Sequence, residues 1–306
     1  MQRAPVIGLV APTGAGKTRV LLDLAARGVP FEVISADSVQ AIREFDIGSA
    51  KPTPAERATL PHHGVDVVAP TGRYDAWRFA AEAKALLESR PDTAFVVTAG
   101  TGLYLSALTD GLSDVPRLPQ ADRDALYAQV IDDAAGWWAR LQREDPASAQ
   151  RIHRNDWRRI GRALEITRAA GRPASAVLAE RPPTGGVDIP LLGIRVEGEA
   201  YERGLRQRVD AMLDAGWIDE VNGLILRHGR NLPGLEAVGY RQIVAWLDAG
   251  GSDDQSALAE AITIATRRYA KRQRTWFRRR DVTWFDGSDH GRRTVVDELE
   301  RRLCVA

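Results

Sequence analysis

The sequence predicts an α/β protein in which a parallel sheet is interrupted by a helical insertion. Three observations support this prediction. Short apolar runs alternate with segments of helical periodicity, a glycine-rich loop joins the first run to the first helix, and the middle of the chain lacks strand patterns. With 306 residues the chain is long enough for two domains. We therefore expect a core formed by residues 1–112 and 188–306, with residues 113–187 as the insertion.

The first elements follow one another in a regular order. Apolar runs predict strands at residues 5–10, 31–35 and 94–98, and helical spacing of apolar residues predicts helices at residues 19–28 and 76–90. Strands that alternate with helices in this way are typical of a parallel sheet with helices on its faces.

The later elements are less regular. Residues 47–70 contain several prolines and little periodicity, and we expect them to form a long surface segment. Residues 113–171 show helical patterns, and the two prolines and two glycines of residues 181–188 end this region. Apolar runs at residues 190–196 and 282–286 then predict strands that return to the sheet.

The composition excludes several classes of protein. Apolar residues make up 44% and charged residues 27%, which argues against a disordered, collagenous or disulfide-rich chain. Cys304 is the single cysteine, so no disulfide can form within the chain. No apolar run reaches the roughly 18 residues that a membrane helix needs. We expect a cytoplasmic protein without a membrane association.

The net charge of +1 hides two basic segments. Residues 266–280 contain eight lysines or arginines and no acid, and residues 151–172 contain seven arginines against two acids. Local charge determines the field that a polyanion meets, so either segment can bind nucleic acid. A charge run is more often a solvated face, and that alternative remains open.

The most specific motif lies between the first strand and the first helix. Backbone N–H groups of a glycine-rich loop at a helix N-terminus bind phosphates, a lysine adds a point charge, and a threonine hydroxyl can hold Mg²⁺. The motif predicts a P-loop NTPase-like core, although Ala11 stands where such loops usually have glycine. The predicted diphosphate-binding residues are Thr13, Gly14, Ala15, Gly16, Lys17 and Thr18, with Thr18 as the Mg²⁺ ligand.

Asp37 is the acid closest to the end of a predicted buried strand. An ATP-hydrolysing protein of this class would normally carry an acid at the end of a neighbouring strand, but residues 94–98 are followed by Ala99, Gly100 and Thr101. Asp37 can coordinate metal, accept a proton, or merely cap the following segment.

Segments spread over nearly the whole chain match the motifs of one enzyme family, in the expected order: APTGAGKT, ISADSVQAIREFDIGSAKP, PHHGVD, AGTGLYLSALTDGL, IHRNDWRRIGRALEI, RVDAMLDAG, AVGYRQ and TRRYAKRQRTWFR. In these segments the chain resembles the tRNA dimethylallyltransferases, also called tRNA isopentenyltransferases. The departures include Ile42 where tyrosine is usual, Ala99 for glycine, and Arg154 and Trp157 for prolines.

The resemblance implies transfer of a dimethylallyl group from dimethylallyl diphosphate. The acceptor would be the exocyclic 6-amino group of the adenosine 3′ of the anticodon, in tRNAs that read codons beginning with U. The chemistry agrees independently, because a P-loop with Mg²⁺ stabilises the charge of a departing diphosphate and a base such as Asp37 helps a poorly nucleophilic amine. The implied catalytic residues are Asp37, Thr101, Arg203 and Arg208, where one arginine clamps the diphosphate.

The resemblance also implies a binding surface for the tRNA anticodon arm, with no obligate protein partner. Thr101 could instead be a helix N-cap, and the aromatics among the basic residues after Thr266 could lie in the core. The implied tRNA-binding residues are Asp37, Ser38, Val39, Gln40, Thr101, Arg123, Arg158, Arg159, Ile160, Gly161, Arg162, Gly239, Tyr240, Arg241, Lys271 and Arg272.

Three other functions remain open from the sequence. An adenylate isopentenyltransferase acting on free nucleotides would share the core chemistry but would not need the two basic segments. A P-loop small-molecule kinase would need the strand-end carboxylate that is missing here. An RNA-binding module with a vestigial P-loop would not need an intact Gly16-Lys17-Thr18 sequence. His62 and His63 lack further ligands at metal spacing, and we expect a structural role for them rather than a zinc site.

Overall fold

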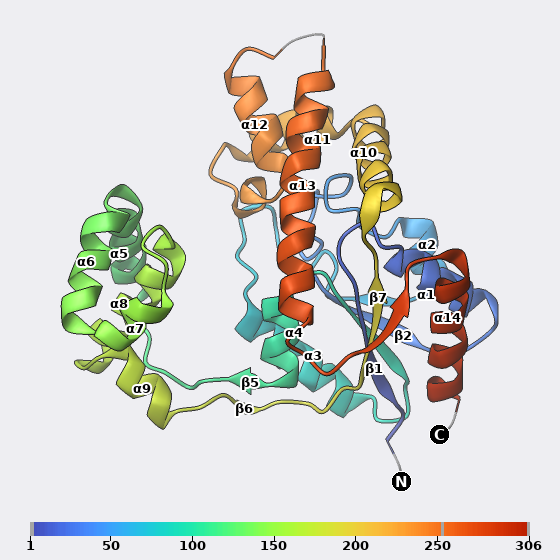
Figure 1. The fold of residues 1–306 in the computed structure, drawn as a ribbon, viewed down its shortest axis with the longest axis horizontal. Helices are drawn as coiled ribbons and strands as arrows, with labels where there is room; N and C mark the ends of the chain where they lie inside the picture. The colour runs from blue at the N-terminus through green and yellow to red at the C-terminus, as the bar shows by residue number, and fades with distance from the viewer. Residues whose placement is uncertain (1–2, 252–253, 305–306) are drawn as a thin grey trace. The chain divides into compact units, whose positions relative to one another are not determined.

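The structure is a computed structural model that describes residues 3–251 and 254–304. It contains two compact units, one formed by Met1–Thr109 with Val187–Ala306 and the other by Asp110–Gly186. The first unit contains the sheet and the second is mainly helical (Figure 1). The expected α/β fold class is confirmed. In the described ranges, no helix combines the length and the hydropathy that a membrane span requires.

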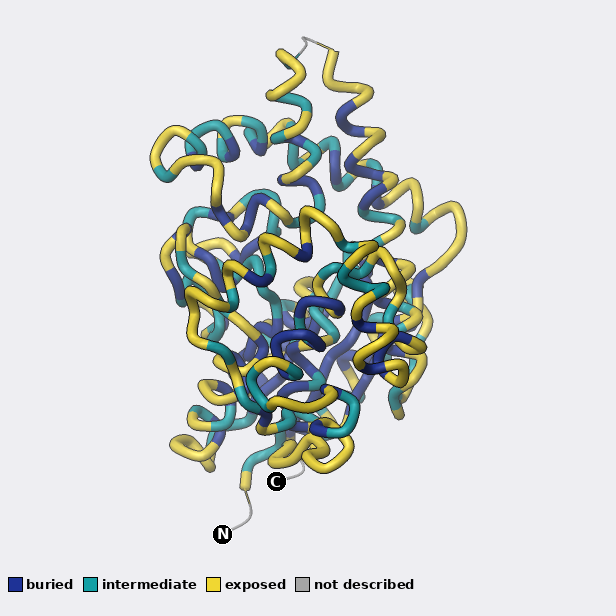
Figure 2. The backbone as a smooth tube through the Cα atoms, turned by 90° about the vertical axis from the view of Figure 1, so that its left-hand side faces the viewer, coloured by how far each residue is buried: buried dark blue, intermediate teal, exposed yellow. Residues whose placement is uncertain are grey.

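Six strands of the first unit pair in parallel, in the order β3-β2-β4-β1-β7-β8. Their nearly continuous apolar sequences suit a parallel sheet that is covered on both faces. Buried residues gather along these strands (Figure 2). The strands are β1 (Val6–Val10), β2 (Glu32–Ala36), β3 (His62–His63), β4 (Phe95–Ala99), β7 (Leu191–Arg195) and β8 (Thr283–Asp286).

The five longer strands coincide with the five apolar runs that predict strands, but the segment of residues 47–70 is more regular than expected. It contains β3 and the short helix α2 (Pro54–Thr59), which buries no residue. A capping box fixes the start of α2, because the Thr53 hydroxyl accepts from the Glu56 N–H at 3.2 Å and the Glu56 carboxylate accepts from the Thr53 N–H at 2.7 Å. Sequence periodicity cannot reveal a two-residue strand or a six-residue helix.

Helices cover the two faces of the sheet. One pair packs together over the core that contains Leu9 and Val96, and another pair lies on the opposite side of the strands (Figure 1). Successive residues of a strand point to opposite faces, so each strand contributes to both cores. The first pair is α1 (Lys17–Ala26) with α14 (Asp289–Leu303), and the second is α3 (Ala76–Ser89) with α4 (Gly102–Thr109).

A second layer of helices has its own hydrophobic core. This core brings together Trp217, Tyr240 and Ile262 with Ile42 and Phe45 from the segment that follows β2. The layer is drawn above the sheet in Figure 1. It consists of α10 (Gly198–Asp214), α11 (Trp217–His228), a 3₁₀ turn at Pro233–Glu236, α12 (Tyr240–Asp248) and α13 (Ser256–Phe277).

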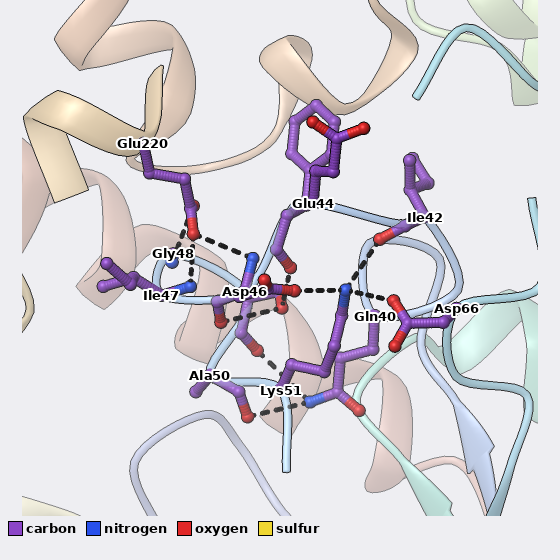
Figure 3. A network of polar contacts seen from close by, with 12 residues as sticks. Gln40, Ile42, Glu44, Asp46, Ile47, Gly48, Ala50, Lys51, Asp66 and Glu220 are labelled. Atoms are coloured by element: carbon purple, nitrogen blue, oxygen red, sulfur yellow. Dashed lines mark hydrogen bonds and ion pairs between the residues drawn. The ribbon is translucent and has the colours of Figure 1, made fainter. Parts of the chain in front are cut away.

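Two charged side chains hold the segment that follows β2 (Figure 3). Lys51, whose side chain is only 3% exposed, donates to a backbone carbonyl at 2.9 Å and to the carboxylates of Asp46 and Asp66, each at 2.6 Å. The Glu220 carboxylate of α11 accepts from the N–H groups of Asp46 at 2.9 Å and Ile47 at 2.7 Å. These contacts satisfy polar groups that the turn itself leaves unpaired.

The second unit is a helical bundle that spans Asp110–Gly186. Asp145, which is 1% exposed, accepts from the hydroxyls of Ser148 and Ser175 and fixes two helix starts. The sequence did not predict the two-residue strands β5 (Gly111–Leu112) and β6 (Thr184–Gly185), which pair antiparallel where the chain enters and leaves the unit. The helices are α5 (Gln120–Asp132), α6 (Ala134–Glu144), α7 (Pro146–Arg151), α8 (Trp157–Ala170) and α9 (Ala174–Glu180).

Replacing Lys51 tests the contribution of this network to stability. Lys51→Met should lower the free energy of unfolding by about 1–3 kcal/mol, because it leaves the buried Ile42 carbonyl without its donor and removes one of the two cations beside Asp66. Arg19→Ala removes the exposed ion pair with Asp23 and should leave stability nearly unchanged. Urea unfolding followed by circular dichroism measures both variants, and equal stabilities would contradict the prediction.

Candidate active site

A cavity of about 990 Å³ lies at the carboxyl ends of the parallel strands. Its lining includes the residues that follow four of these strands: Thr13 after β1, Asp37 after β2, Gly100 after β4 and Val196 after β7. Open α/β sheets bind ligands at this edge, since parallel strands bring their ends to one place. The cavity therefore brings together the two chemical features that the sequence singled out, the glycine-rich loop and Asp37.

The glycine-rich loop adopts a conformation that requires two of its glycines. Gly14 and Gly16 have φ angles of +75° and +92°, in the left-handed region that side chains disfavour. Gly16 caps the N-terminus of α1, and the first turn of this helix carries no acidic residue. Its free N–H groups and the helix dipole therefore favour an anion in the cavity.

Lys17 is the cation of this loop. Its ammonium donates to the carbonyl of Ala11 at 2.9 Å, so the side chain folds back over the loop. Burial lowers the pKa of Lys17 to about 8, Asp37 opposes this shift by raising the pKa, and Arg208 lowers it further. An anionic ligand placed among these groups stabilises the charged form of the lysine.

Asp37 follows the last residue of β2, as expected, and one of its carboxylate oxygens lies beside Gly100, which follows β4. Its Oδ1 accepts from the N–H groups of Val39 at 2.9 Å and Gln40 at 3.3 Å, which fixes the side chain. A Cβ atom added at Gly100 would lie 2.9 Å from Oδ2, so this carboxylate needs the absence of a side chain there. The arrangement presents a carboxylate oxygen to the cavity.

The two candidate arginines of α10 lie in different environments. Arg208 lines the cavity, and burial lowers its pKa below the ordinary value for arginine. Arg203 is not among the lining residues; its side chain is 67% exposed and lies 3.4 Å from Glu199. Of these two arginines, Arg208 is the one that is placed to contact an anion in the cavity.

The expected base-contacting residues are mostly engaged within the protein. The Gln40 amide donates to the carbonyls of Ser49 and Ala50, each at 3.2 Å, and accepts from Ser35 at 2.8 Å. Gln40 therefore holds the loop that borders the cavity, whereas Ser38 and Val39 are half-buried beside it. Thr101 precedes α4, and its N–H donates to the carbonyl of Ala36 at 3.1 Å.

In the helical unit, some of the residues of α8 that were expected to bind tRNA are buried and others are exposed. Ile160 and Gly161 are buried in the core of the unit, so they lie on the inner face of α8. Arg158 stacks at 4.3 Å over Trp157, and Arg159 is exposed. Half-buried Arg162 lies 2.8 Å from Glu165, and Arg123 of α5 donates to Gln120.

The segment at the start of α12 also contains both buried and exposed residues. Tyr240 is completely buried; its hydroxyl donates to Glu220 at 2.6 Å and its ring packs on Phe45 and Trp217. Gly239 is buried as well, because a Cβ atom there would meet the Trp217 ring. Arg241 is the exposed member of the three.

Helix α13 divides its basic residues between an exposed face and the interior, where Arg274 donates to the carbonyl of Val196 at 3.1 Å. Lys271 and Arg272 are exposed, whereas Phe277 is fully buried and Tyr269 lines the cavity. The aromatic residues among these basic residues therefore lie mainly in the interior, as the sequence analysis allowed. The same helix supplies a cavity residue that sequence reasoning missed, the buried Gln273.

His62 and His63 each have a partner within the protein. His62 lies 2.7 Å from the carbonyl of Leu60, and His63 lies 2.6 Å from the Glu32 carboxylate. Within the described residues, no group of three or more histidine, cysteine, aspartate or glutamate side chains could hold a metal ion. A cation in the cavity would therefore need the Thr18 hydroxyl and ligand oxygens.

Comparisons with known proteins agree with these features. The IPP transferase family model matches residues 40–280. The tRNA dimethylallyltransferase of Thiobacillus denitrificans is 43% identical over 90% of this chain and 88% of its own length. The tRNA isopentenylpyrophosphate transferase of Bacillus halodurans has a similar structure, with a TM-score of 0.68, 32% identity, and coverage of 98% of this chain and 97% of its own. A eukaryotic dimethylallyltransferase solved as acting on tRNA gives a TM-score of 0.78 at 26% identity, over 97% of this chain and 77% of its own.

The lowered pKa of Lys17 predicts a pH dependence of anion binding. Lysine loses its charge above its pKa, so the affinity for inorganic pyrophosphate should fall by up to about tenfold per pH unit above pH 8. Because pyrophosphate itself titrates, the affinity is compared with that of Lys17→Met at each pH, measured by calorimetry. A ratio of the two affinities that stays constant from pH 7 to 10 would show that Lys17 does not bind the anion as a charged group.

Proposed function

The chain belongs to the IPP transferase family, and from this membership we propose that it transfers a dimethylallyl group from dimethylallyl diphosphate to a tRNA. The acceptor is the exocyclic 6-amino nitrogen of the adenosine 3′ of the anticodon, in tRNAs that read codons beginning with U. The observation that best supports this function is a cavity in which the P-loop and Asp37 share one edge of the sheet. We further propose that the protein acts in the cytoplasm, where this tRNA is available.

The reaction exchanges one bond for another. The allylic carbon–oxygen bond breaks, pyrophosphate leaves with the bonding electrons, and a nitrogen–carbon bond forms at the adenine. Lys17, the loop N–H groups and Arg208 stabilise the charge that develops on the leaving pyrophosphate. Asp37 accepts the proton that the amino nitrogen must lose, because this nitrogen is a poor nucleophile while it retains that proton.

A divalent cation is consistent with a transferase that uses a diphosphate substrate, and we propose Mg²⁺. Thr18 is exposed and lines the cavity, so its hydroxyl could hold the ion together with diphosphate oxygens. Mg²⁺ usually keeps several waters and binds few protein oxygens together with substrate phosphates, so this donor set fits it. Bound there, the ion would neutralise charge on the diphosphate.

The acceptor base must leave the stack of the anticodon loop to reach a cavity of this kind. We propose that the exposed cations of α8, chiefly Arg158 and Arg159, and those of α13, Lys271 and Arg272, bind the RNA backbone. Arg241 extends this set on α12. These residues are solvent-exposed, as phosphate-contacting groups need to be.

One assay separates this function from its alternatives. The protein is incubated with Mg²⁺ and radiolabelled dimethylallyl diphosphate together with either unmodified tRNA or AMP, and a control contains labelled ATP alone. Label in tRNA supports the proposal, and label in AMP would indicate an adenylate isopentenyltransferase. ATP turnover would indicate a kinase, but β4 ends without the acid that such an enzyme normally uses.

Asp37→Asn tests the proposed base. Asparagine keeps an oxygen that can accept from Val39 and Gln40, so the local turn should persist. Loss of the proton acceptor should lower kcat by about 10² to 10⁴, while tRNA affinity changes little. Rapid-quench transfer assays and filter binding measure the two quantities, with exposed Asp92→Asn as the control. An unchanged kcat at unchanged tRNA affinity would exclude Asp37 as the base.

The double variant Arg158→Gln/Arg159→Gln tests the RNA contacts of the helical unit. Each lost phosphate contact should reduce the slope of log affinity against log salt by about 0.7–0.9, and the loss of affinity should be similar for different tRNA sequences. Arg143→Gln, on the exposed surface of the same unit, should leave the slope unchanged. If the double variant behaves like this control, α8 does not bind the RNA backbone.

A further inference from the structure

Gln273 of α13 connects the two halves of the cavity. Its side chain is 5% exposed; Oε1 accepts from the N–H of Thr13 in the P-loop at 2.9 Å, and Nε2 donates to the carbonyl of Gly100 at 2.6 Å. These partners fix the orientation of the amide, because a backbone N–H only donates and a backbone carbonyl only accepts. One side chain therefore joins the P-loop to the strand end beside which the Asp37 carboxylate lies.

Two tyrosines bond to the backbone of the same two residues, Thr13 and Gly100. The Tyr201 hydroxyl of α10 donates to the carbonyl of Thr13 at 2.7 Å, and the Tyr269 hydroxyl of α13 donates to the carbonyl of Gly100 at 3.1 Å. Burial raises the pKa of both phenols to about 12, so the hydroxyls keep their protons near neutral pH. Thr13 of the P-loop is thus held by side chains from α10 and α13, which lie far from it in the sequence.

We propose that Gln273 is a positioning residue, whose amide sets the placement of the P-loop relative to the Asp37 carboxylate during prenyl transfer. This inference rests on the proposed function, because one geometry must then hold both the leaving pyrophosphate and the proton acceptor. Displacements of about 1 Å between reacting groups can lower a rate by about 10². The side chain contributes no group to the reaction itself.

Gln273→Glu changes this contact with almost no change in size. An ionised glutamate still accepts from Thr13 but places a second acceptor against the Gly100 carbonyl, where the amide donates. A protonated glutamic acid restores the donor. The defect of the variant should therefore diminish as the pH falls, which a general loss of stability would not produce.

The experiment measures kcat and KM of the full chain with dimethylallyl diphosphate and saturating tRNA from pH 5.5 to 8.5. At pH 8, Gln273→Glu should lower kcat by about 10² while tRNA affinity stays within about twofold. The ratio of variant to wild-type kcat should rise at least tenfold towards pH 6. Gln207→Glu, which adds the same charge on an exposed face of α10, should match the wild type at every pH.

A ratio that does not change with pH, or a kcat equal to that of the wild type, would overturn the proposal. If the variant does not fold, Tyr201→Phe removes the hydrogen bond to the Thr13 carbonyl, on the same residue of the P-loop. The proposal then requires a weaker affinity for inorganic pyrophosphate at unchanged tRNA affinity. Failure of the wild type to prenylate tRNA would instead refute the proposed function. In that case the pH-dependent pyrophosphate affinity of Gln273→Glu still decides whether the amide positions the P-loop.

Discussion

The parallel pairing of β1 with β4 and β7 is the constraint on which the site depends. Parallel strands end at the same edge, so the P-loop after β1, Asp37 after β2 and Gly100 after β4 become neighbours although they are far apart in the sequence. An antiparallel arrangement of the same strands would divide these residues between two edges. The chemistry of the site therefore follows from the direction in which the strands run.

Helices α10 and α13 line the cavity at this edge of the sheet, and α10 contributes the positive charge of Arg208 to it. They bring Arg208, Tyr201 and Gln273 to the cavity, where burial lowers the pKa of Lys17. A cation in such an environment interacts strongly with an anionic ligand, because less solvent screens the charge. Helix α13 also exposes Lys271 and Arg272 on its outer side, so one helix has both a cavity-lining face and a basic solvent face.

Local sequence patterns predicted the strands, the P-loop and the position of Asp37 because each depends on a few consecutive residues. The faces of α8 and α12 could not be predicted in this way. A family resemblance identifies a segment such as Tyr240 and its neighbours, but only tertiary packing decides that this ring lies against Trp217. Gln273 was missed for a related reason, since its two partners come from distant strand ends and its neighbours in sequence are strongly basic.

The helical insertion leaves and rejoins the core at neighbouring points. The N–H of Val187 donates to the carbonyl of Leu108 at 2.8 Å. Next to this bond, residues near the two ends of the insertion pair as the short antiparallel strands β5 and β6. The insertion adds no strand to the six-stranded sheet. The hydrophobic cores of the two units consist of different residues. Each can open or unfold on its own timescale, and evolution can lengthen, trim or exchange the inserted module without rebuilding the catalytic sheet.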